Sequence, residues 1–489
     1  MPNNLARFFL PIALFVGALA LSLSMRALSL NTPYFCWDEH DYIAHNIYHK
    51  LVIQGFEIPF SNKWPLGHAL IYFLTKGCDP FQIISYRVVT AALDSVTAVL
   101  LGFLACPQRD PKRNLWAVVA LFSAALSIPL RSSAGILAES LANPFLAIGA
   151  LCLQGCRSSS LGGICSVISF ACACWVKPTA VFPGLLMAGS FLWPHRKNWR
   201  TVISFCGTVL VCLLISVLVF VLNNSFGSGY LLPSALQYNF SSSVFGLRPM
   251  IAYLDVFFTG ASFFEFLFPW LIFCLLLLPE RSLLSHQLLS LSWLAGAVLN
   301  LGIRPAGAQT AYWLYVLPPM LWLGWLGWKN FSSDFSLTKR YIVSGFVLVP
   351  LAYGWMVNLV GPPLGLHPGG RGGILQIQTQ VADLQPALEA LRSHPRYRET
   401  QSRLLLWGMP WQVFYLGRCI PATSLLTSES WSYGIGLEKQ RRWVASGLTN
   451  ADFVWLDNGP GADDIKALLP GKFEPFYQAE GRTLYARIN

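Results

Sequence analysis

Long apolar segments separated by short polar connections make up most of the first 361 residues. We interpret as membrane spans the segments near residues 8–29, 87–106, 115–132, 134–155, 161–176, 179–194, 201–222, 260–279, 287–303, 310–328 and 341–361. Each is roughly long enough for the ~30 Å hydrocarbon core of a bilayer, some only marginally. A Lys177-Pro178 break separates the two shortest segments, which are also compatible with broken or re-entrant helices. The pattern predicts a mainly α, polytopic membrane protein with about eleven transmembrane helices.

The basic residues predict how the chain is oriented. They fall in alternate connections between apolar segments, so the positive-inside rule puts the amino terminus in the cytoplasm and the carboxyl terminus outside the cell inner (plasma) membrane. The first segment exceeds a signal-peptide core in length, and no small-residue cleavage site precedes Pro33, so we expect a retained anchor.

Composition agrees with a membrane protein. With 54% hydrophobic and 12% charged residues, the chain has more apolar side chains than one soluble core of 489 residues could hide. The net charge of +11 does not indicate nucleic acid as a partner, because no long basic run or nucleic-acid motif accompanies it.

Three polar stretches lie on the predicted outer side, near residues 31–86, 223–259 and beyond 361. The first contains segments 38–50 and 64–73, which we expect to form helices along the membrane interface. We therefore expect the functional residues to lie on the outer face.

The tail changes character at a Gly- and Pro-rich linker, 362–373, which divides a transmembrane domain, 1–361, from an extracytoplasmic domain, 374–489. The domain should be a small α/β unit. Its expected elements are a helix at 381–391, buried strands at 404–407 and 453–456, and a hairpin over 473–488 that turns at Glu480-Gly481.

Most of the twelve cysteines lie in or beside predicted spans, where they behave as small apolar residues. Cys36 and Cys78 share one predicted outer loop. Because connectivity does not follow from sequence, both a disulfide between them and two free thiols stay open.

An acidic motif, Trp37-Asp38-Glu39-His40-Asp41-Tyr42, follows the first span. Asp38 has a structural explanation as the cap of the helix that follows, and a functional one as a general base or positioning carboxylate for an acceptor hydroxyl. The two roles are compatible.

Glu139 lies in an apolar run, where an acidic side chain costs on the order of 2.5–3.5 kcal/mol at mid-span. This cost makes Glu139 a candidate site residue. The alternative is that its helix starts just before it, so that the carboxylate reaches the outer interface without a role.

Six basic residues fall at predicted outer ends of spans or in predicted outer loops, although basic residues usually favour the cytoplasmic side. They are Lys63, Arg87, Arg131, Lys177, Arg248 and Arg304. Lipid phosphate would explain them, because Arg presents a fork that suits its oxygens. The alternative is snorkelling to headgroups.

His40, His45 and His49 include a helical i,i+4 pair, which can bind zinc. No third clear ligand accompanies them, so we favour solvated or interfacial histidines and predict no metal site. No glycine-rich nucleotide loop occurs, so a transferred sugar is expected to arrive in the bilayer rather than on a nucleotide.

Together these motifs resemble the C superfamily of membrane glycosyltransferases, in particular the bacterial branch of glycosyltransferase family 39, which includes protein O-mannosyltransferases and aminoarabinose transferases. The resemblance rests on the acidic motif, on Trp64-Pro65-Leu66-Gly67-His68, on Arg87 and on Ala138-Glu139-Ser140. It extends into the tail at Leu406-Trp407-Gly408-Met409-Pro410-Trp411 and Tyr415-Leu416-Gly417-Arg418. His40 stands where many members have a small residue, and Lys177 where Arg is common.

The resemblance implies a polyprenyl-phosphate sugar donor, an acceptor on the outer face, inversion by direct displacement, and Asp38 as catalytic base. We therefore expect catalytic roles for Asp38, Glu139 and Glu39. Substrate or phosphate contacts are expected for Lys63, Arg87, His68, Lys177, Arg304 and Tyr42.

The acceptor, whether glycan, lipid or protein, stays open, as does a divalent metal, and no cofactor is indicated. Membrane lipids are further expected partners. The alternatives are a transporter or flippase of lipid-linked sugars, which predicts inverted repeats and a mid-membrane site, and a non-catalytic assembly subunit. No internal repeat is visible in the sequence.

Overall fold

The computed structural model describes residues 2–27, 30, 37–55, 65–106, 112–127, 138–155, 160–223, 284–301, 313–331, some positions between 336 and 352, and 382–408, 411–423, 437–459, 461–479 and 481–488. The chain divides into two compact units. The first comprises Met1–Leu30, Thr90–Val217 and Ser243–Gly373, and the second comprises Asn31–Val89, Leu218–Ser242 and Ile374–Asn489.

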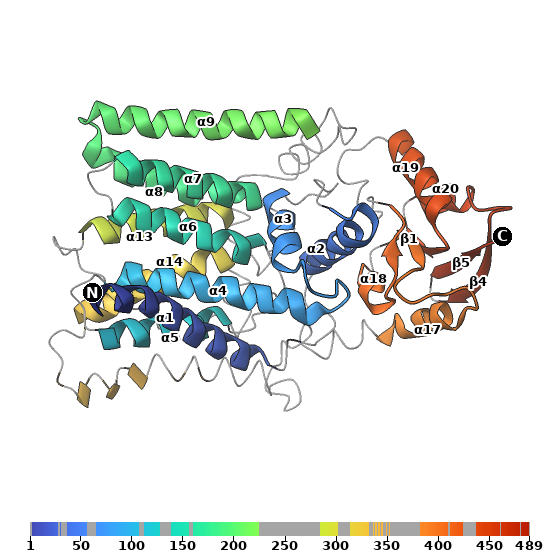
Figure 1. Ribbon diagram of the computed structural model, residues 1–489, viewed down its shortest axis with the longest axis horizontal. Helices are drawn as coiled ribbons and strands as arrows, with labels where there is room; N and C mark the ends of the chain where they lie inside the picture. Colours follow the sequence, from blue (N-terminus) through green and yellow to red (C-terminus); the bar gives the residue numbers. More distant parts are fainter. Residues whose placement is uncertain are drawn as a thin grey trace. The chain divides into compact units, whose positions relative to one another are not determined.

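The first unit is a bundle of helices that run side by side (Figure 1). Its described helices are α1 (Pro2–Arg26), most of α4 (Ile83–Ala105), α5 (Lys112–Ser127), α6 (Ala138–Gly155), α7 (Ser160–Val176), α8 (Val181–His195), α9 (Trp199–Asn223), α13 (Leu284–Leu301) and α14 (Trp313–Phe331). Each predicted span that the structure describes therefore contains a helix. The predicted span 260–279 and most of 341–361 lie outside the described residues.

Three of the described helices are long and apolar enough to cross a membrane: Phe9–Arg26, Ile83–Ala105 and Trp199–Leu218. Others, such as Asn114–Ser127 and Leu161–Val176, are apolar but shorter. Eleven crossings stay a prediction.

The expected break between α7 and α8 is present. Lys177 is extended, with φ −148° and ψ 121°, and the short 3-10 helix η2 (Pro178–Ala180) connects it to α8. Pro178 explains the break, because proline has no backbone N–H to donate and disfavours helical conformation in the residue before it.

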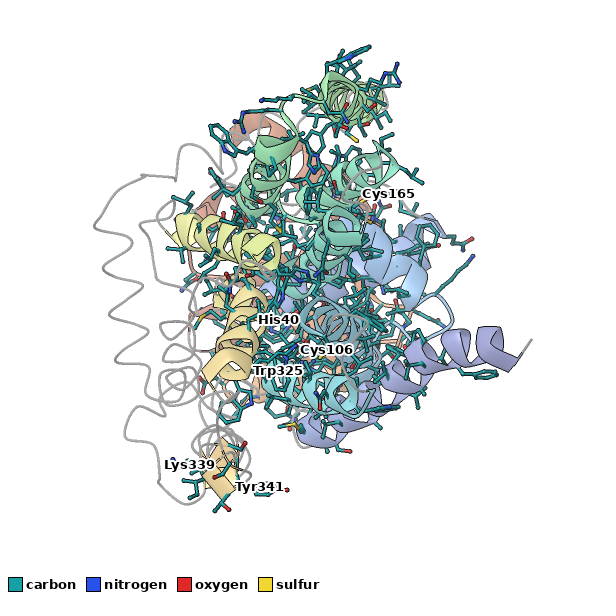
Figure 2. All side chains as sticks on the ribbon, turned by 90° about the vertical axis from the view of Figure 1, so that its left-hand side faces the viewer. His40, Cys106, Cys165, Trp325, Lys339 and Tyr341 are labelled. Atoms are coloured by element: carbon teal, nitrogen blue, oxygen red, sulfur yellow. The ribbon has the colours of Figure 1, made fainter. Side chains whose placement is uncertain are left out.

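The buried cysteines of the bundle pack as small apolar residues, as the sequence predicts. Cys106 is 7% exposed and lies among the helices (Figure 2). Cys78 is an exposed free thiol, whereas Cys36 lies outside the described residues.

The second unit begins with α2 (Trp37–Tyr48), which continues into a π-helical turn, η1 (His49–Ile53), and with α3 (Pro65–Leu74). The side-chain amide of Asn46 on α2 donates hydrogen bonds to the hydroxyls of Tyr86, at 2.8 Å, and Thr75, at 3.0 Å. These bonds tie α2 to the end of α3 and to the first turn of α4.

The same unit contains the carboxyl-terminal sheet, in the order β2-β1-β3-β5-β4. Its strands are β1 (Arg403–Trp407), β2 (Ile420–Pro421), β3 (Phe453–Asp457), β4 (Phe473–Ala479) and β5 (Arg482–Arg487). β1 pairs in parallel with β2 and β3, and β5 pairs antiparallel with β3 and β4. In the described part of the tail, four helices accompany the sheet: α17 (Gln385–Ser393), α18 (Val413–Leu416), α19 (Leu437–Asn450) and α20 (Ala462–Lys466).

The predicted small α/β fold of the tail is therefore present. Leu405 and Val454, on neighbouring parallel strands, belong to a core that also includes Val444 and Leu448 of α19. The hairpin turns through Gly481, whose φ of 76° favours glycine. The predicted domain boundaries at 361 and 373 lie outside the described residues and stay predictions.

Candidate active site

The acidic motif lies at the start of α2. The helix begins at Trp37, so Asp38 is its second residue, inside the first turn rather than before it. The helix dipole favours a carboxylate in the first turn, and the free N–H groups favour one at the cap position. The side chain of Asp38 lies outside the described part of the chain.

Glu39 forms a bidentate ion pair with Arg87, near the start of α4. Arg87 Nε donates to Glu39 Oε1 at 3.0 Å, and Arg87 Nη2 donates to Glu39 Oε2 at 3.0 Å. Both side chains are fully buried. The structure thus brings together a predicted catalytic acid and a predicted phosphate cation, each of which compensates the charge of the other.

His40 packs against the tail. Its ring stacks on Tyr415 of α18, with centroids 5.5 Å apart and planes 18° apart. Burial, and secondarily the Arg87 charge, lowers the pKa of His40 to about 3. His40 is therefore neutral near pH 7.

The next residues of the motif form a polar cluster with α3. One oxygen of Asp41 lies 3.2 Å from His45 Nε2, and the other lies 3.9 Å from His68 Nε2. Tyr42 and His68 contact each other with ring centroids 4.7 Å apart. Gly67 permits this approach, because a Cβ there would lie 2.9 Å from the Tyr42 hydroxyl oxygen.

The histidines of α2 and η1 are buried rather than solvated or interfacial, because α3 and the tail cover them. Burial, and secondarily the charge of His45, lowers the pKa of His49 to about 3. Within the described ranges, no group of three His, Cys, Asp or Glu side chains is arranged to hold a metal ion.

In the first unit, Glu139 pairs with Lys177. α6 begins at Ala138, so Glu139 is in its first turn, and its side chain is fully buried. Lys177 Nζ donates to Glu139 Oε1, and the side chain of Lys177 is 14% exposed. Glu139 Oε2 is buried and accepts no hydrogen bond from any described residue. This oxygen is a candidate acceptor for a substrate hydroxyl.

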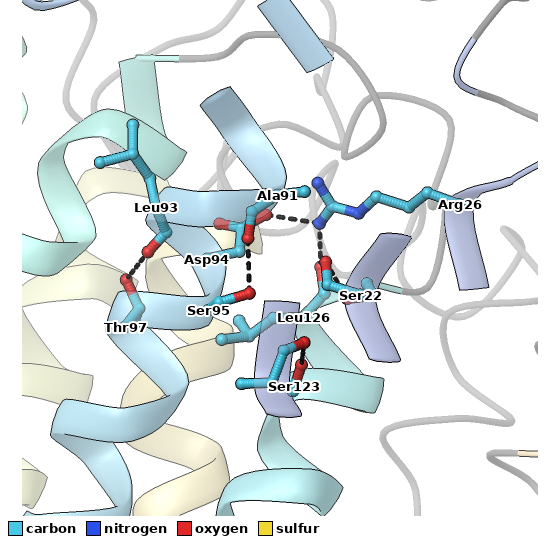
Figure 3. A network of polar contacts seen from close by, with 11 residues as sticks. Ser22, Arg26, Ala91, Leu93, Asp94, Ser95, Thr97, Ser123 and Leu126 are labelled. Atoms are coloured by element: carbon cyan, nitrogen blue, oxygen red, sulfur yellow. Dashed lines mark hydrogen bonds and ion pairs between the residues drawn. The ribbon is translucent and has the colours of Figure 1, made fainter. Parts of the chain in front are cut away.

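A further buried network was not predicted from the sequence (Figure 3). Arg26 Nη2, at the end of α1, contacts Asp94 Oδ2 of α4 at 2.5 Å and donates to the carbonyl of Leu126 in α5 at 2.8 Å. Ser140 of α6 also hydrogen-bonds Asp94. A sequence signal existed, because Asp94 is the one acidic residue of an otherwise apolar span, and such residues are functional candidates.

The tail contacts the segment between α1 and α4 at a second place. Arg418 Nη2 lies 3.1 Å from Asp79 Oδ2, and Arg418 Nε lies 2.6 Å from Glu399 Oε1. The guanidinium also lies 5.2 Å from the centroid of the Phe81 ring. Together with the His40–Tyr415 stack, these contacts hold the tail sequence around 415–418 against α2 and the residues that precede α4.

Several predicted site residues lie outside the described part of the chain, namely Lys63, Arg131, Arg248 and Arg304. Of the predicted residues that are described, Glu39, Tyr42, His68 and Arg87 belong to the second unit, whereas Glu139 and Lys177 belong to the first.

Comparison with solved structures finds ArnT from Cupriavidus metallidurans in two states. The apo crystal structure matches with a TM-score of 0.61 and 13% identity, over 98% of both chains. The crystal structure bound to undecaprenyl phosphate matches with a TM-score of 0.60 and 14% identity, again over 98% of both. The archaeal oligosaccharyltransferase AglB from Archaeoglobus fulgidus, in complex with an inhibitory peptide and a dolichol-phosphate, matches with a TM-score of 0.47 and 9% identity, over 99% of this chain and 74% of AglB.

No protein-family model and no curated protein sequence matches the chain. The two ArnT matches show that the chain shares the fold of ArnT over nearly its whole length. The family resemblance predicted from the motifs is confirmed at the level of the fold.

Proposed function

We propose that the protein is an integral-membrane glycosyltransferase that moves a sugar from a polyprenyl-phosphate carrier to an acceptor hydroxyl on the extracytoplasmic face. The observation that carries the proposal is the similarity of nearly the whole chain to ArnT, which was crystallised with undecaprenyl phosphate. The acidic motif on α2 and the buried Glu139–Lys177 pair supply carboxylates and a cation of the kinds that this chemistry needs.

In the proposed reaction the acceptor oxygen attacks the anomeric carbon of the donor. The bond between that carbon and the phosphate oxygen breaks, so polyprenyl phosphate leaves and the anomeric configuration inverts. Asp38 takes the proton of the acceptor hydroxyl. A positioned general base of this kind contributes typically about 10²–10⁴-fold to the rate.

Glu139 and Lys177 act together in this proposal. Lys177 is partly exposed, so it can approach a phosphate oxygen while Glu139 holds its ammonium group in place. The buried Oε2 of Glu139 accepts a hydrogen bond from a substrate hydroxyl. A cation near the leaving phosphate stabilises the charge that develops there.

Glu39 and Arg87 have a different role. Because both oxygens of Glu39 bind Arg87, the pair holds the start of α2 against α4 and thereby positions Asp38. Tyr42 of α2 and His68 of α3 contact each other, and we assign them to the substrate side. Lys63 and Arg304 remain candidate phosphate contacts.

The test is transfer by the purified, reconstituted protein. Labelled polyprenyl-phosphate sugars are screened against lipid, glycan and peptide acceptors, and released polyprenyl phosphate is measured beside product. Asp38→Asn should lower kcat by about 10²–10⁴-fold. Asp463→Asn, at an exposed position of α20, is the matched control and should leave transfer unchanged.

A fully active Asp38→Asn variant would disprove the base assignment. A wild-type protein that moves lipid-linked sugar across vesicles without transferring it would instead favour the flippase alternative.

A further inference from the structure

The turn between α8 and α9 carries exposed cations and indoles that the proposed reaction does not use. We define the aromatic-basic turn as Trp193, Arg196, Lys197, Trp199 and Arg200. All five side chains are exposed, and the two indoles expose 71% and 65% of their surfaces. Because the apolar span of α9 begins at Trp199, the turn stands at the end of a span. Trp and Tyr are enriched at this level of membrane proteins.

The backbone of this turn has a defined conformation. The N–H of Asn198 donates to the carbonyl of His195 at 2.8 Å, and the N–H of Val202 donates to the carbonyl of Asn198 at 3.2 Å. The side chain of Asn198 accepts a hydrogen bond from the N–H of Thr201 at 3.5 Å, as a helix cap does. The cations are therefore presented from a fixed turn.

Each arginine lies over an indole. The guanidinium carbon of Arg196 is 4.7 Å from the centroid of Trp193, and that of Arg200 is 5.7 Å from the centroid of Trp199. Arg196 also donates to the carbonyl of Trp193 at 2.8 Å. A guanidinium that rests on an aromatic face keeps N–H groups at its edge, and these can bind two oxygens of one phosphate.

The positive charge of the turn is uncompensated among the described residues. No Asp or Glu occurs between Glu139 and Asp255 in the sequence. In the part of the chain that the structure describes, no carboxylate forms an ion pair with Arg196, Lys197 or Arg200. A net-negative ligand would supply the missing charge.

We propose that the aromatic-basic turn binds the headgroup of an anionic phospholipid. The phosphodiester accepts hydrogen bonds from the arginine edges, Lys197 adds a third charge, and the indoles lie beside the glycerol region of the same lipid. A zwitterionic headgroup carries its own ammonium and so competes less well. This site lies apart in sequence from the residues assigned to glycosyl transfer, and binding there does not depend on that activity.

The experiment uses the full-length protein in micelles of a neutral detergent. Native mass spectrometry and thermal unfolding are measured with added phosphatidylglycerol and, separately, phosphatidylcholine. Wild-type protein should retain phosphatidylglycerol preferentially and unfold at a higher temperature with it. Arg196→Gln/Arg200→Gln should reduce the relative affinity for phosphatidylglycerol by roughly tenfold or more, because two surface cations are lost.

Two further variants keep the test decisive. Lys466→Gln/Lys472→Gln removes two exposed cations from the carboxyl-terminal domain, and it should keep the wild-type preference. Arg196→Lys/Arg200→Lys keeps the charge without the planar fork, and its preference should lie between those of the wild type and the Gln variant.

The proposal is overturned if the Gln variant keeps the wild-type preference, or if the Lys466/Lys472 control loses as much. It is also overturned if inorganic phosphate at the same concentration stabilises the protein as well as the lipid does, since the ligand would then be a free anion.

Discussion

At the residue scale, the charges of the candidate site occur as ion pairs. Glu39 binds Arg87 and Glu139 binds Lys177, so each pair joins a residue predicted as an acid to one predicted as a phosphate cation. The two pairs differ in exposure. Both side chains of the first pair are fully buried, whereas Lys177 is partly exposed and Glu139 has one oxygen that accepts no hydrogen bond from a described residue. This difference supports a structural role for the first pair and a substrate role for the second.

The first pair can be tested by stability. Arg87→Met alone leaves a buried carboxylate without its partner, and we expect it to destabilise the protein by about 3–5 kcal/mol. Glu39→Met/Arg87→Met removes both charges and should recover most of that loss, because apolar residues of similar volume can replace a buried ion pair. Unfolding of both variants is followed in detergent by intrinsic fluorescence.

A different result would identify Arg87 as a substrate ligand. If Arg87→Met unfolds like the wild type but binds the polyprenyl-phosphate donor more weakly, then the arginine serves the phosphate and the structural assignment is wrong.

His40 predicts a pH dependence of stability. Its pKa is about 3 in the folded protein and 6.5 in an unpaired histidine. Between these values the unfolded chain binds a proton that the native state does not, so stability falls as pH decreases from 6.5 towards 3. His40→Phe keeps a ring against Tyr415 but cannot bind this proton. Between pH 7 and pH 5, its free energy of unfolding should therefore fall by about 2 kcal/mol less than that of the wild type.

This prediction is measured as the difference between the unfolding free energies of the two proteins at each pH. Parallel curves for the wild type and His40→Phe over this range would show that His40 is not held neutral.

At the scale of elements, close backbone contacts set how the helices of the bundle pack. A Cβ at Gly296 of α13 would collide with backbone atoms of Phe182 and Pro183 at the start of α8. Gly149 of α6 similarly lies against the ring of Phe170 in α7. Gly296 therefore lets α13 approach α8 closely, and Gly149 lets α6 approach α7 closely.

Gly296→Ala should therefore destabilise the bundle by about 1–3 kcal/mol, because backbone atoms cannot move aside as a side chain can. Gly207→Ala on α9 is the matched control. A Cβ there meets nothing within 4 Å, so the change should be neutral or stabilising by up to about 1 kcal/mol from helix propensity alone. Thermal unfolding of the two variants in one detergent makes the comparison, and equal effects would contradict the packing argument.

At the scale of the whole molecule, the chain combines a helical bundle with a unit in which the segment Asn31–Val89 and the tail share one compact structure. The sequence by itself predicts this segment and the tail as separate parts. The Tyr415–His40 stack and the Arg418–Asp79 ion pair show instead that tail residues contact the loop helix that bears the acidic motif. The tail therefore packs against α2.

The sequence alone determined the places of the apolar helices that the structure describes in the bundle, the break at Lys177-Pro178 and the α/β character of the tail. These features depend on local composition and on the spacing of apolar residues, and both can be read from a short stretch of sequence. The tertiary structure decided which charges meet. Glu39 and Arg87 are 48 residues apart, Glu139 and Lys177 are 38 apart, and Arg26 and Asp94 are 68 apart. No local pattern specifies such partners. They are selected only when packed helices remove both charges from water, because each buried charge then needs the other to compensate it.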